Sequence, residues 1–280
     1  MREIHVQRLK ETVKALALDA AWKLGDREQA ALRRLAREET SPLGRQALSV
    51  LVENFELAGK EQRPLCQDTG LALVFVEVGR EARFVGGDPE TAINEGVREA
   101  WREGRLRASV LDDPLLRRNT GDNTPAIVHW DLAPGDRVRV LFDAKGGGCE
   151  NCSRFTMLTP AQGRAGVIRF VAQVVRESGG NPCPPLVIGV GLGGSFERAC
   201  LLAKKALFRP LGEPNAKPHL AELERELLEA ANQTGVGPLG LGGTCTALAV
   251  HVEAGPCHIA SLPVAVNLDC HSHRHEEAVL

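Results

Sequence analysis

A near-continuous run of apolar residues at positions 71–78 constrains the fold of this 280-residue chain more than any other feature. Apolar side chains on both faces of an extended segment predict a strand that is buried on both sides within a sheet. The run follows directly on the segment 66–70, which reads Cys-Gln-Asp-Thr-Gly. A loop that enters a buried strand therefore carries a soft metal ligand and, two residues later, a candidate acid or base.

The composition of the chain argues against a nucleic-acid-binding or membrane-spanning protein. The net charge is −2, Tyr is absent and aromatic residues make up 4% of the chain, so neither a basic surface nor a base-stacking surface is indicated. No stretch approaches the roughly 18 consecutive apolar residues of a membrane span. The N-terminus begins with the charged residues Arg2 and Glu3, continues as an amphipathic segment and lacks the apolar core of a secretion signal, which predicts a cytoplasmic protein.

The chain contains eight cysteines, and their surroundings divide them into two groups. Because the cytoplasm keeps thiols reduced, we expect no disulfide bonds, and most of the cysteines, such as Cys200 in a predicted helix, are expected to be small buried hydrophobic residues. Cys66, Cys183 and Cys270 differ because each lies in a predicted loop close to a proline or a carboxylate. These three are the better candidates for metal ligands.

The N-terminal part of the chain is predicted to be helical. Leu9, Val13, Leu16 and Ala20 recur at helical spacing, and Ser41 is a candidate N-cap for a later helix. Residues 3–59 are therefore expected to form helices, the second at 29–37 and the third at 42–57. Further helices are predicted at 89–102, 163–178, 196–207 and 220–232.

The remainder of the chain predicts a sheet with helices packed on it. Besides 71–78, strands are expected at 126–132, 137–142, 186–190, 246–252 and 258–267. The turn 134–136 is expected to join the second and third strands as a hairpin. Hairpins and crossovers together indicate an α+β fold, in which N-terminal helices (1–60) precede a mixed-sheet α/β body (61–280) with helices packed on the sheet. We expect the whole chain, 1–280, to form one domain.

A glycine pattern at residues 189–194 fits the dinucleotide-binding fingerprint G-x-G-x-x-G between a strand and a helix. That fingerprint also needs a second strand that ends in an acidic residue roughly 20 positions later. The corresponding region, 209–214, reads as a proline-bearing linker. Anion binding or close packing at the start of the following helix is the alternative role of these glycines.

Two further arrangements of cysteine and histidine compete as chemical sites. Cys149 and Cys152 form a C-x-x-C pair that could be half of a zinc site, but neither Cys257-His258 nor the three histidines of the tail offers the usual second pair. The tail residues His273 and His275 are expected to be solvated. A nucleophilic role for Cys66 would need a histidine base that the sequence alone does not identify.

A three-cysteine site is the remaining interpretation. Thiolates are the usual protein ligands of iron–sulfur clusters, and a cluster held by only three of them leaves one iron open to substrate. Cys66, Cys183 and Cys270 are each isolated in a loop with polar or proline neighbours. Because they are far apart along the chain, their spacing alone proves nothing.

Several longer motifs carry a family resemblance. They are residues 66–70, Asn-Thr-Gly-Asp-Asn-Thr-Pro-Ala at 119–126, Lys-Gly-Gly-Gly at 145–148, Cys-Pro-Pro at 183–185 and His-Ile-Ala-Ser-Leu-Pro-Val at 258–264. From about Arg8 to His275 the chain resembles the α subunit, or N-terminal domain, of the class I iron–sulfur hydro-lyases. These are the oxygen-sensitive fumarate hydratases and the L-tartrate dehydratases.

The resemblance implies a [4Fe–4S] cluster in which one iron has no protein ligand. It implies that loops hold this cluster through Cys66, Cys183 and Cys270. It also implies a dicarboxylate substrate in contact with Gln67, Asp68, Arg107, Gly148 and His258, of which Asp68 and His258 are the candidates to carry or steady protons. An arginine can bind a carboxylate through two parallel hydrogen bonds, and a glycine lets a substrate approach the backbone closely.

The resemblance further implies a separate β-type subunit, in a complex expected to be α2β2, that supplies the proton-abstracting base. Among the substrates, the motifs at 119–126 and 258–264 favour reversible hydration of fumarate to (S)-malate, a step of the tricarboxylic acid cycle. L-tartrate dehydratase is the alternative, and Cys149 resembles the tartrate enzymes. A non-catalytic metal-binding scaffold is the second alternative. Cys149, Cys152 and Cys245 are expected to be small residues without a ligand role, although Cys152 and Cys257 leave an alternative cluster ligand open.

Overall fold

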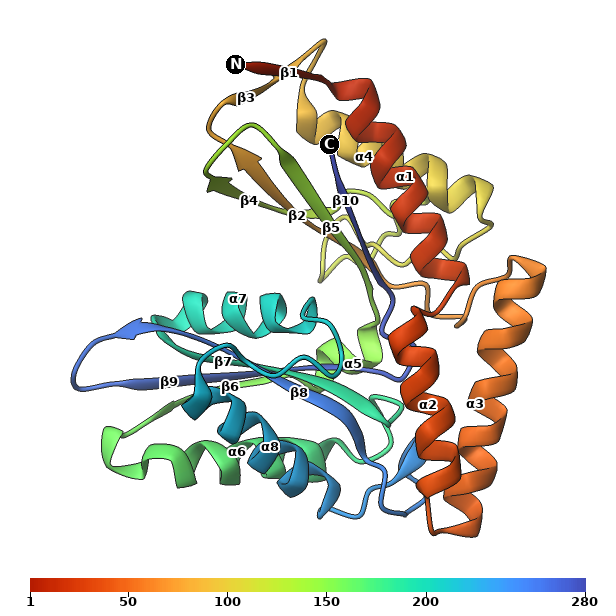
Figure 1. Cartoon of the computed structure of the whole chain (residues 1–280). Coiled ribbons are helices and arrows are strands. Elements are labelled where there is room, and N and C mark those ends of the chain that lie inside the picture. Colours follow the sequence, from red (N-terminus) through yellow and green to blue (C-terminus); the bar gives the residue numbers. More distant parts are fainter. The chain divides into compact units, whose positions relative to one another are not determined.

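The computed structural model describes all 280 residues, which divide into two compact units (Figure 1). The first unit comprises Met1–Leu24, Phe55–Gly147 and Arg274–Leu280, and the second comprises Gly25–Asn54 and Gly148–His273. Each unit contains helices and a mixed four-stranded sheet, so the predicted α+β class is confirmed. Two such sheets take the place of the single mixed sheet that we expected.

The sheet of the first unit is built around the apolar run that opens the sequence analysis. Strand β2 (Leu71–Gly79) lies between β4 (Ile127–Ala133), to which it is parallel, and β5 (Val138–Lys145), to which it is antiparallel. Val74 and Val76 of β2 are fully buried. Helices α1 (Val6–Trp22) and α4 (Pro89–Glu103) contribute to the same apolar core, and this burial confirms the predicted interior strand.

The predicted hairpin at 134–136 is wrong, because β2 separates the two strands that the turn connects. The sheet order is β10-β5-β2-β4. The carbonyl oxygens of Ala133 and Gly135 accept hydrogen bonds from the backbone N–H groups of Arg80 and Glu81, which follow β2. The turn therefore passes over the end of β2, and the most apolar strand takes the central place.

The predicted solvated tail is also wrong. Residues His275–Val279 form β10, which pairs antiparallel with β5, and His273 is only 2% exposed. The ring of His273 lies 2.8 Å from the Asp269 carboxylate through its Nδ1 atom. The N-terminal residues Arg2–His5 likewise form a short strand, β1, which pairs with β3 (Ala82–Val85).

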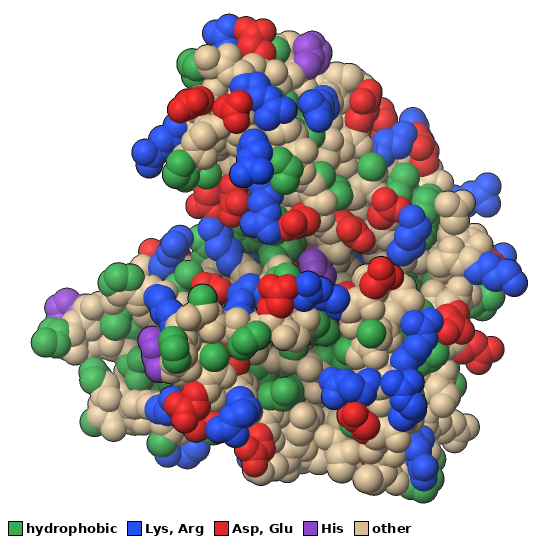
Figure 2. Space-filling model, in the orientation of Figure 1, with side chains coloured by type: hydrophobic (Ala, Val, Ile, Leu, Met, Phe, Trp, Pro, Cys, Tyr) green, Lys and Arg blue, Asp and Glu red, His purple; other side chains and the backbone are tan.

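The predicted helix cap at Ser41 is confirmed. Ser41 Oγ accepts a hydrogen bond from the Gly44 N–H at 3.3 Å at the start of α3 (Pro42–Glu61), and Asp88 caps α4 through the Thr91 N–H at 2.7 Å. Helix α2 (Asp26–Glu38) precedes α3. No helix combines the length and the apolar character needed to cross a membrane. On the face drawn in Figure 2, basic and acidic side chains are interspersed, as the net charge of −2 suggests.

The sheet of the second unit has the order β6-β9-β7-β8. Helices α6 and α8 pack on one face, and α7 packs on the other (Figure 1). The elements of this unit are α5 (Gly147–Cys152), β6 (Arg154–Leu158), η1 (Pro160–Gln162), α6 (Gly163–Ser178), β7 (Leu186–Gly194), α7 (Phe196–Leu207), α8 (Pro218–Asn232), η2 (Pro238–Gly240), β8 (Ala247–Cys257) and β9 (Leu262–Asp269).

The glycines of the G-x-G-x-x-G pattern lie within strand β7, where they allow α7 to pack directly on the sheet. A Cβ atom at Gly189 would lie 2.1 Å from the Ala203 carbonyl oxygen, and one at Gly191 would lie 2.0 Å from that of Ala199. Real Cβ atoms do not approach oxygen so closely. Close packing therefore explains this pattern without a nucleotide.

A buried carboxylate fixes the glycine-rich segment before β8. Glu39 is 2% exposed and accepts hydrogen bonds from the backbone N–H groups of Ser41, Thr244 and Cys245 at 2.8–2.9 Å. Burial raises the pKa of this carboxyl group, but the hydrogen bonds outweigh burial and lower the pKa from 4.5 to about 2. The ionised form of Glu39 thus stabilises the folded second unit.

We predict that Gly191→Ala destabilises the protein by about 2–3 kcal/mol, because the added methyl group forces α7 away from β7. The measurement is urea unfolding followed by circular dichroism. Gly255→Ala is the control, since its Cβ would meet only Leu202 at an ordinary 3.6 Å. Equal stabilities of the two variants would contradict the packing role of Gly191.

We predict that Glu39→Gln lowers the free energy of unfolding by up to about 3 kcal/mol at pH 7, which corresponds to the pKa shift from 4.5 to about 2. A carboxyl group with a lowered folded-state pKa stabilises fully above its unfolded pKa, and this contribution is lost as the pH falls from about 4.5 towards 2. The difference in the free energy of unfolding between the wild type and Glu39→Gln should therefore become smaller as the pH falls.

Chemical denaturation at a series of pH values from 7 downwards measures that difference. Glu38→Gln is the control, because Glu38 is exposed and its ion pair with Arg34 should contribute no more than about 0.5 kcal/mol. A constant difference in the free energy of unfolding between wild type and Glu39→Gln across the series would show that the ionised form of Glu39 is not the stabilising form.

Candidate functional site

Asp68 is the best-anchored of the predicted site residues in the first unit. Its carboxylate accepts hydrogen bonds from the backbone N–H groups of Gly70 at 3.1 Å and Gly147 at 2.8 Å. The Arg107 guanidinium lies 3.5 Å from the same carboxylate and is itself largely exposed. Gly70 has φ +78°, and a Cβ there would lie 2.6 Å from the Ala144 carbonyl, so the turn into β2 requires glycine.

The rest of the 66–70 turn brings Cys66 and Gln67 to the same place. Cys66 is half-buried, and its Sγ atom lies 3.5 Å from Gln67 Oε1. The hydroxyl of Thr69 donates to the Arg107 carbonyl oxygen at 2.7 Å, which ties the arginine's loop to the turn. The first unit therefore assembles four predicted residues: Cys66, Gln67, Asp68 and Arg107.

Arg274 is a residue of this site to which sequence reasoning gave no role of its own. It is 4% exposed, and its Nη1 atom donates to the Asp68 backbone oxygen at 2.5 Å. Its own carbonyl oxygen accepts from the Ala144 N–H at 2.9 Å. The available signal was an arginine four residues after Cys270.

Asn123 is a second site residue to which sequence reasoning gave no role, and it binds the backbone of the 66–70 turn. It is fully buried with φ +60°, its Nδ2 donates to the Gly70 carbonyl at 3.2 Å, and its Oδ1 accepts from the Ser109 N–H at 2.7 Å. Asparagine tolerates this left-handed conformation better than most residues. The signal in the sequence was the Gly-Asp-Asn-Thr-Pro run around it.

Two charged residues of β5 are buried in the first unit. Asp143 is 3% exposed and Lys145 is 2% exposed. Because they are two positions apart on a strand, their side chains point to the same face. Ionisable side chains are rarely buried so fully unless a paired charge or a function retains them, and both were visible as polar breaks in an apolar strand.

In the second unit, the loops that carry Cys183 and Cys270 contact each other. Cys183 is exposed, has φ +54° and precedes Pro184 and Pro185. Its carbonyl oxygen lies 3.0 Å from Nδ1 of His271 and accepts a hydrogen bond from the His271 N–H at 3.4 Å. The residue after Cys270 thus binds the backbone of Cys183, which brings two of the three predicted ligand loops together.

The start of helix α5, at residues 148–149, joins them in the second unit. The Cys149 thiol donates to the Pro182 carbonyl oxygen at 3.4 Å, and a Cβ at Gly148 would lie 3.2 Å from the Asn181 carbonyl oxygen. The thiols of Cys149 and Cys270 and the Asp269 carboxylate lie within 4.8 Å of one another. Gly148 therefore lies against the backbone of the loop before Cys183, and its contact with a substrate stays a prediction.

The remaining cysteines do not join this group. Cys152 is buried in the apolar cluster under α6 and α8, where it packs as a small hydrophobic residue. Burial raises the pKa of the Cys245 thiol to about 11, which disfavours a thiolate there. Cys257 is exposed, and its thiol donates to the Ser261 carbonyl oxygen at 3.4 Å in the loop between β8 and β9.

His258 is the predicted residue that the fold keeps apart from the cysteines of its own unit. It is exposed, and its Nδ1 accepts from the Ala260 N–H at 3.1 Å. It precedes β9, whereas Cys270 follows that strand. An eight-residue strand spans roughly 23 Å, so His258 lies at the opposite end of the sheet from Cys270.

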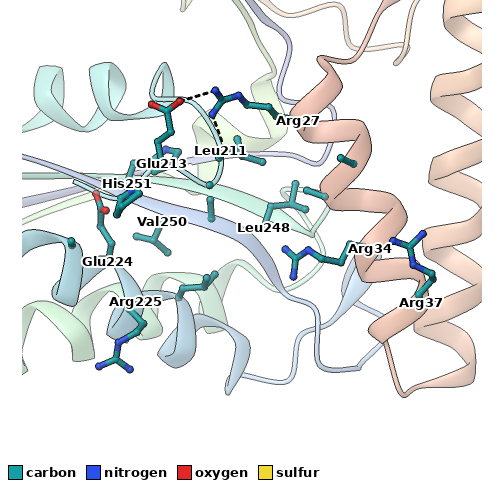
Figure 3. A pocket seen from close by; sticks show the side chains of 17 residues that line it. Arg27, Arg34, Arg37, Leu211, Glu213, Glu224, Arg225, Leu248, Val250 and His251 are labelled. Carbon is teal, nitrogen blue, oxygen red and sulfur yellow. Dashed lines mark hydrogen bonds and ion pairs between the residues drawn. The ribbon is translucent and has the colours of Figure 1, made fainter. Parts of the chain in front are cut away.

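A cavity of about 670 Å³ lies elsewhere in the second unit, at the outer edge of β8 (Figure 3). Its floor is mostly apolar, and Arg27, Arg34 and Arg37 of α2 line one side. Arg27 pairs with Glu213 at 2.7 Å, which the dashed line in Figure 3 marks. None of the predicted site residues lines this cavity.

Comparison with known proteins identifies relatives along almost the whole chain. Residues 10–279 match the family described as fumarate hydratase (Fumerase). A Methanocaldococcus jannaschii protein with the provisional name L(+)-tartrate dehydratase subunit alpha is 38% identical over 95% of both chains. The L(+)-tartrate dehydratase alpha subunits of Escherichia coli strains UTI89 and K12 are 34% and 33% identical, over 96% of this chain and 89% of theirs.

We predict that Asn123→Ala destabilises the first unit by about 2 kcal/mol or more, because it leaves the buried Gly70 carbonyl and the Ser109 N–H unpaired. Asn119→Ala, which removes two exposed hydrogen bonds of the same loop, is the matched control and should cost less than about 1 kcal/mol. Thermal and urea unfolding measure both, and a smaller loss for Asn123→Ala than for Asn119→Ala would contradict this role.

Proposed function

The chain belongs to the fumarate hydratase (Fumerase) family, and on this premise we propose that it is the α subunit of a hydro-lyase for a four-carbon hydroxy-dicarboxylic acid. The observation that carries the proposal is the group formed by Cys66, Gln67, Asp68 and Arg107 on one turn and its neighbouring loop. This group offers a soft ligand, an acid or base and an exposed guanidinium that can bind a carboxylate.

L(+)-tartrate is the substrate that the relatives support best. The motifs in the sequence favoured fumarate, but the similar proteins carry the name L(+)-tartrate dehydratase, and Cys149 agrees with them. Loss of one hydroxyl group and of the proton on the neighbouring carbon converts tartrate into water and an enol, which becomes oxaloacetate. Reversible hydration of fumarate to (S)-malate, and with it a place in the tricarboxylic acid cycle, is the second candidate.

The residues present fit an iron–sulfur cluster by their chemistry. Cys66 of the first unit and Cys183 and Cys270 of the second unit are reduced thiols on loops, and none of them is fully buried. Thiolates are the usual ligands of [4Fe–4S] clusters. When bound by three cysteines, such a cluster would supply a Lewis-acidic iron without a protein ligand, suited to the departing or attacking hydroxyl group.

The chain's own side chains would bind and orient the substrate around that group. Arg107 can hold a substrate carboxylate, because its side chain is 58% exposed. Its contact with Asp68 involves one guanidinium nitrogen, at 3.5 Å. Gln67 can donate to a substrate oxygen, and Gly148 allows the backbone to approach the substrate. The Asp68 carboxylate, held by two backbone N–H groups, is positioned to accept or return a proton.

A partner chain is part of the proposal. The similar proteins are named as alpha subunits, which supports a β-type subunit that carries the second proton-transfer group, in an assembly that we predict to be α2β2. His258 lies at the far end of β9 from Cys270, and its role in carrying or steadying a proton stays a prediction. The cytoplasmic location expected from the sequence stays a prediction.

The test of the substrate uses the chain co-expressed with its β partner and reconstituted with iron and sulfide without oxygen. We expect kcat/KM for L(+)-tartrate to exceed that for fumarate or (S)-malate by at least about tenfold, equivalent to about 1.4 kcal/mol. The reverse order would favour the fumarate hydratase activity, and inactivity on all three acids would reject the proposed function.

For the proton-transfer role, we predict that Asp68→Asn lowers kcat of the αβ complex at least about 100-fold while iron content stays unchanged. Asparagine retains an oxygen that can accept the Gly147 N–H, so the turn should persist. Asp112→Asn, which removes a more exposed carboxylate that also pairs with an arginine, is the control and should retain activity. Near-normal turnover of Asp68→Asn would remove Asp68 from the mechanism.

A further inference from the structure

Cys270 has two neighbours in the second unit that are not among the proposed cluster ligands. The Cys149 and Cys270 thiols and the Asp269 carboxylate each offer one ligand atom, and these three atoms lie within 4.8 Å of one another. Cys149 is 4% exposed and Asp269 is 3% exposed, whereas Cys270 is half-buried. Two sulfur atoms and one oxygen atom thus lie close together at a largely buried position.

This group is held by rigid parts of the fold. Cys149 lies on helix α5, and in the metal-free chain its thiol donates to the Pro182 carbonyl oxygen at 3.4 Å, a hydrogen bond that ends when the thiol loses its proton to bind a cation. Asp269 is the last residue of β9, and its Oδ2 atom lies 2.8 Å from Nδ1 of the buried His273. Carboxylates that bind a metal are themselves usually held by hydrogen bonds, and His273 makes such a contact with Asp269.

The donor set selects the kind of cation. Two thiolates favour a borderline-soft ion such as Zn²⁺ over Mg²⁺ or Ca²⁺, which prefer oxygen. With Zn–S bonds of about 2.3 Å, two sulfurs on a tetrahedral zinc ion stand about 3.8 Å apart. The observed spacing of at most 4.8 Å therefore needs an approach of about 1 Å or less. A water molecule would complete the fourth position.

We propose that Cys149, Asp269 and Cys270 of the cluster-free chain bind one zinc ion. Binding releases the two thiol protons to solvent, and the two thiolates balance the 2+ charge of the cation, so that the carboxylate leaves the site with a net charge of −1. This part of the inference rests on the proposed function, in which Cys270 is a cluster ligand. Because both sites need Cys270, the zinc ion and the cluster exclude each other. A zinc ion bound by this trio, Cys149, Asp269 and Cys270, would prevent Cys270 from binding iron.

The test is an anaerobic titration of the cluster-free chain with Co²⁺, a spectroscopic substitute for Zn²⁺, in the presence of a reductant. We expect one cobalt per chain, with the thiolate charge-transfer band and the visible bands of a tetrahedral site. Addition of Zn²⁺ should abolish this spectrum. Cys149→Ser and Asp269→Asn should each weaken cobalt binding at least about tenfold.

Two controls separate this site from the cluster ligands. Cys183→Ser and Cys200→Ser should bind cobalt as the wild type does, because neither residue belongs to the trio. Loss of the cobalt spectrum in Cys183→Ser, or its persistence in Cys149→Ser with circular dichroism unchanged in both, would overturn the proposal. Cys149→Ser is the decisive variant, since Asp269 also contacts His273.

Iron loading then shows which of the two proposals fails, if one does. Cys149→Ser should take up iron and sulfide like the wild type, whereas Cys183→Ser should not. Prior zinc loading should reduce iron uptake several-fold in the wild type and leave Cys149→Ser unaffected. Cobalt binding through the trio without any cluster would refute the proposed function alone, and a cluster without cobalt binding would refute the zinc site alone.

Discussion

The burial of β2 between β4 and β5 is the constraint on which the first unit depends. The most apolar strand of that unit takes the centre of the sheet, and the chain must therefore enter it through the 66–70 turn at a fixed place. Gly70 allows that entry, and Asn123 and Arg274 bind the turn's carbonyl oxygens from two distant parts of the sequence. Asp68 is thus oriented by the backbone of its surroundings, so its position follows from the packing of the sheet.

In the second unit, polar side chains likewise hold loops of irregular backbone. Glu39 satisfies the N–H groups of the segment before β8, and His271 binds the carbonyl of Cys183. Buried carbonyl and N–H groups need such partners, since an unpaired one costs free energy comparable to a lost hydrogen bond. Loops with this support can keep a reactive thiol such as Cys183 exposed without losing their shape.

Most helices and strands could be predicted from the sequence, because apolar spacing and caps such as Ser41 and Asp88 are local signals. The order of strands could not, since whether β4 pairs with β5 or with β2 depends on contacts between distant residues. Strand β10 was missed because Glu276 and Glu277 interrupt any apolar pattern. For the site, Cys66, Gln67, Asp68 and Arg107 were predicted and are found together, whereas Asn123 and Arg274 act through backbone contacts that leave little trace in a sequence. His258 belongs to the 258–264 motif that carries part of the family resemblance, and yet the length of β9 separates it from Cys270.

The first unit is assembled from three separate stretches of chain, and the last of them is Arg274–Leu280. During synthesis the second unit has all its residues once His273 has been added, whereas the sheet of the first unit waits for residues 275–279, which form β10. Helix α1 is therefore made before any element of the second unit but belongs to the unit that is completed later. Until β10 is made, the edge of β5 that it covers lacks its pairing strand. A chain cut before residue 274 would contain every residue of the second unit and would lack one strand of the first.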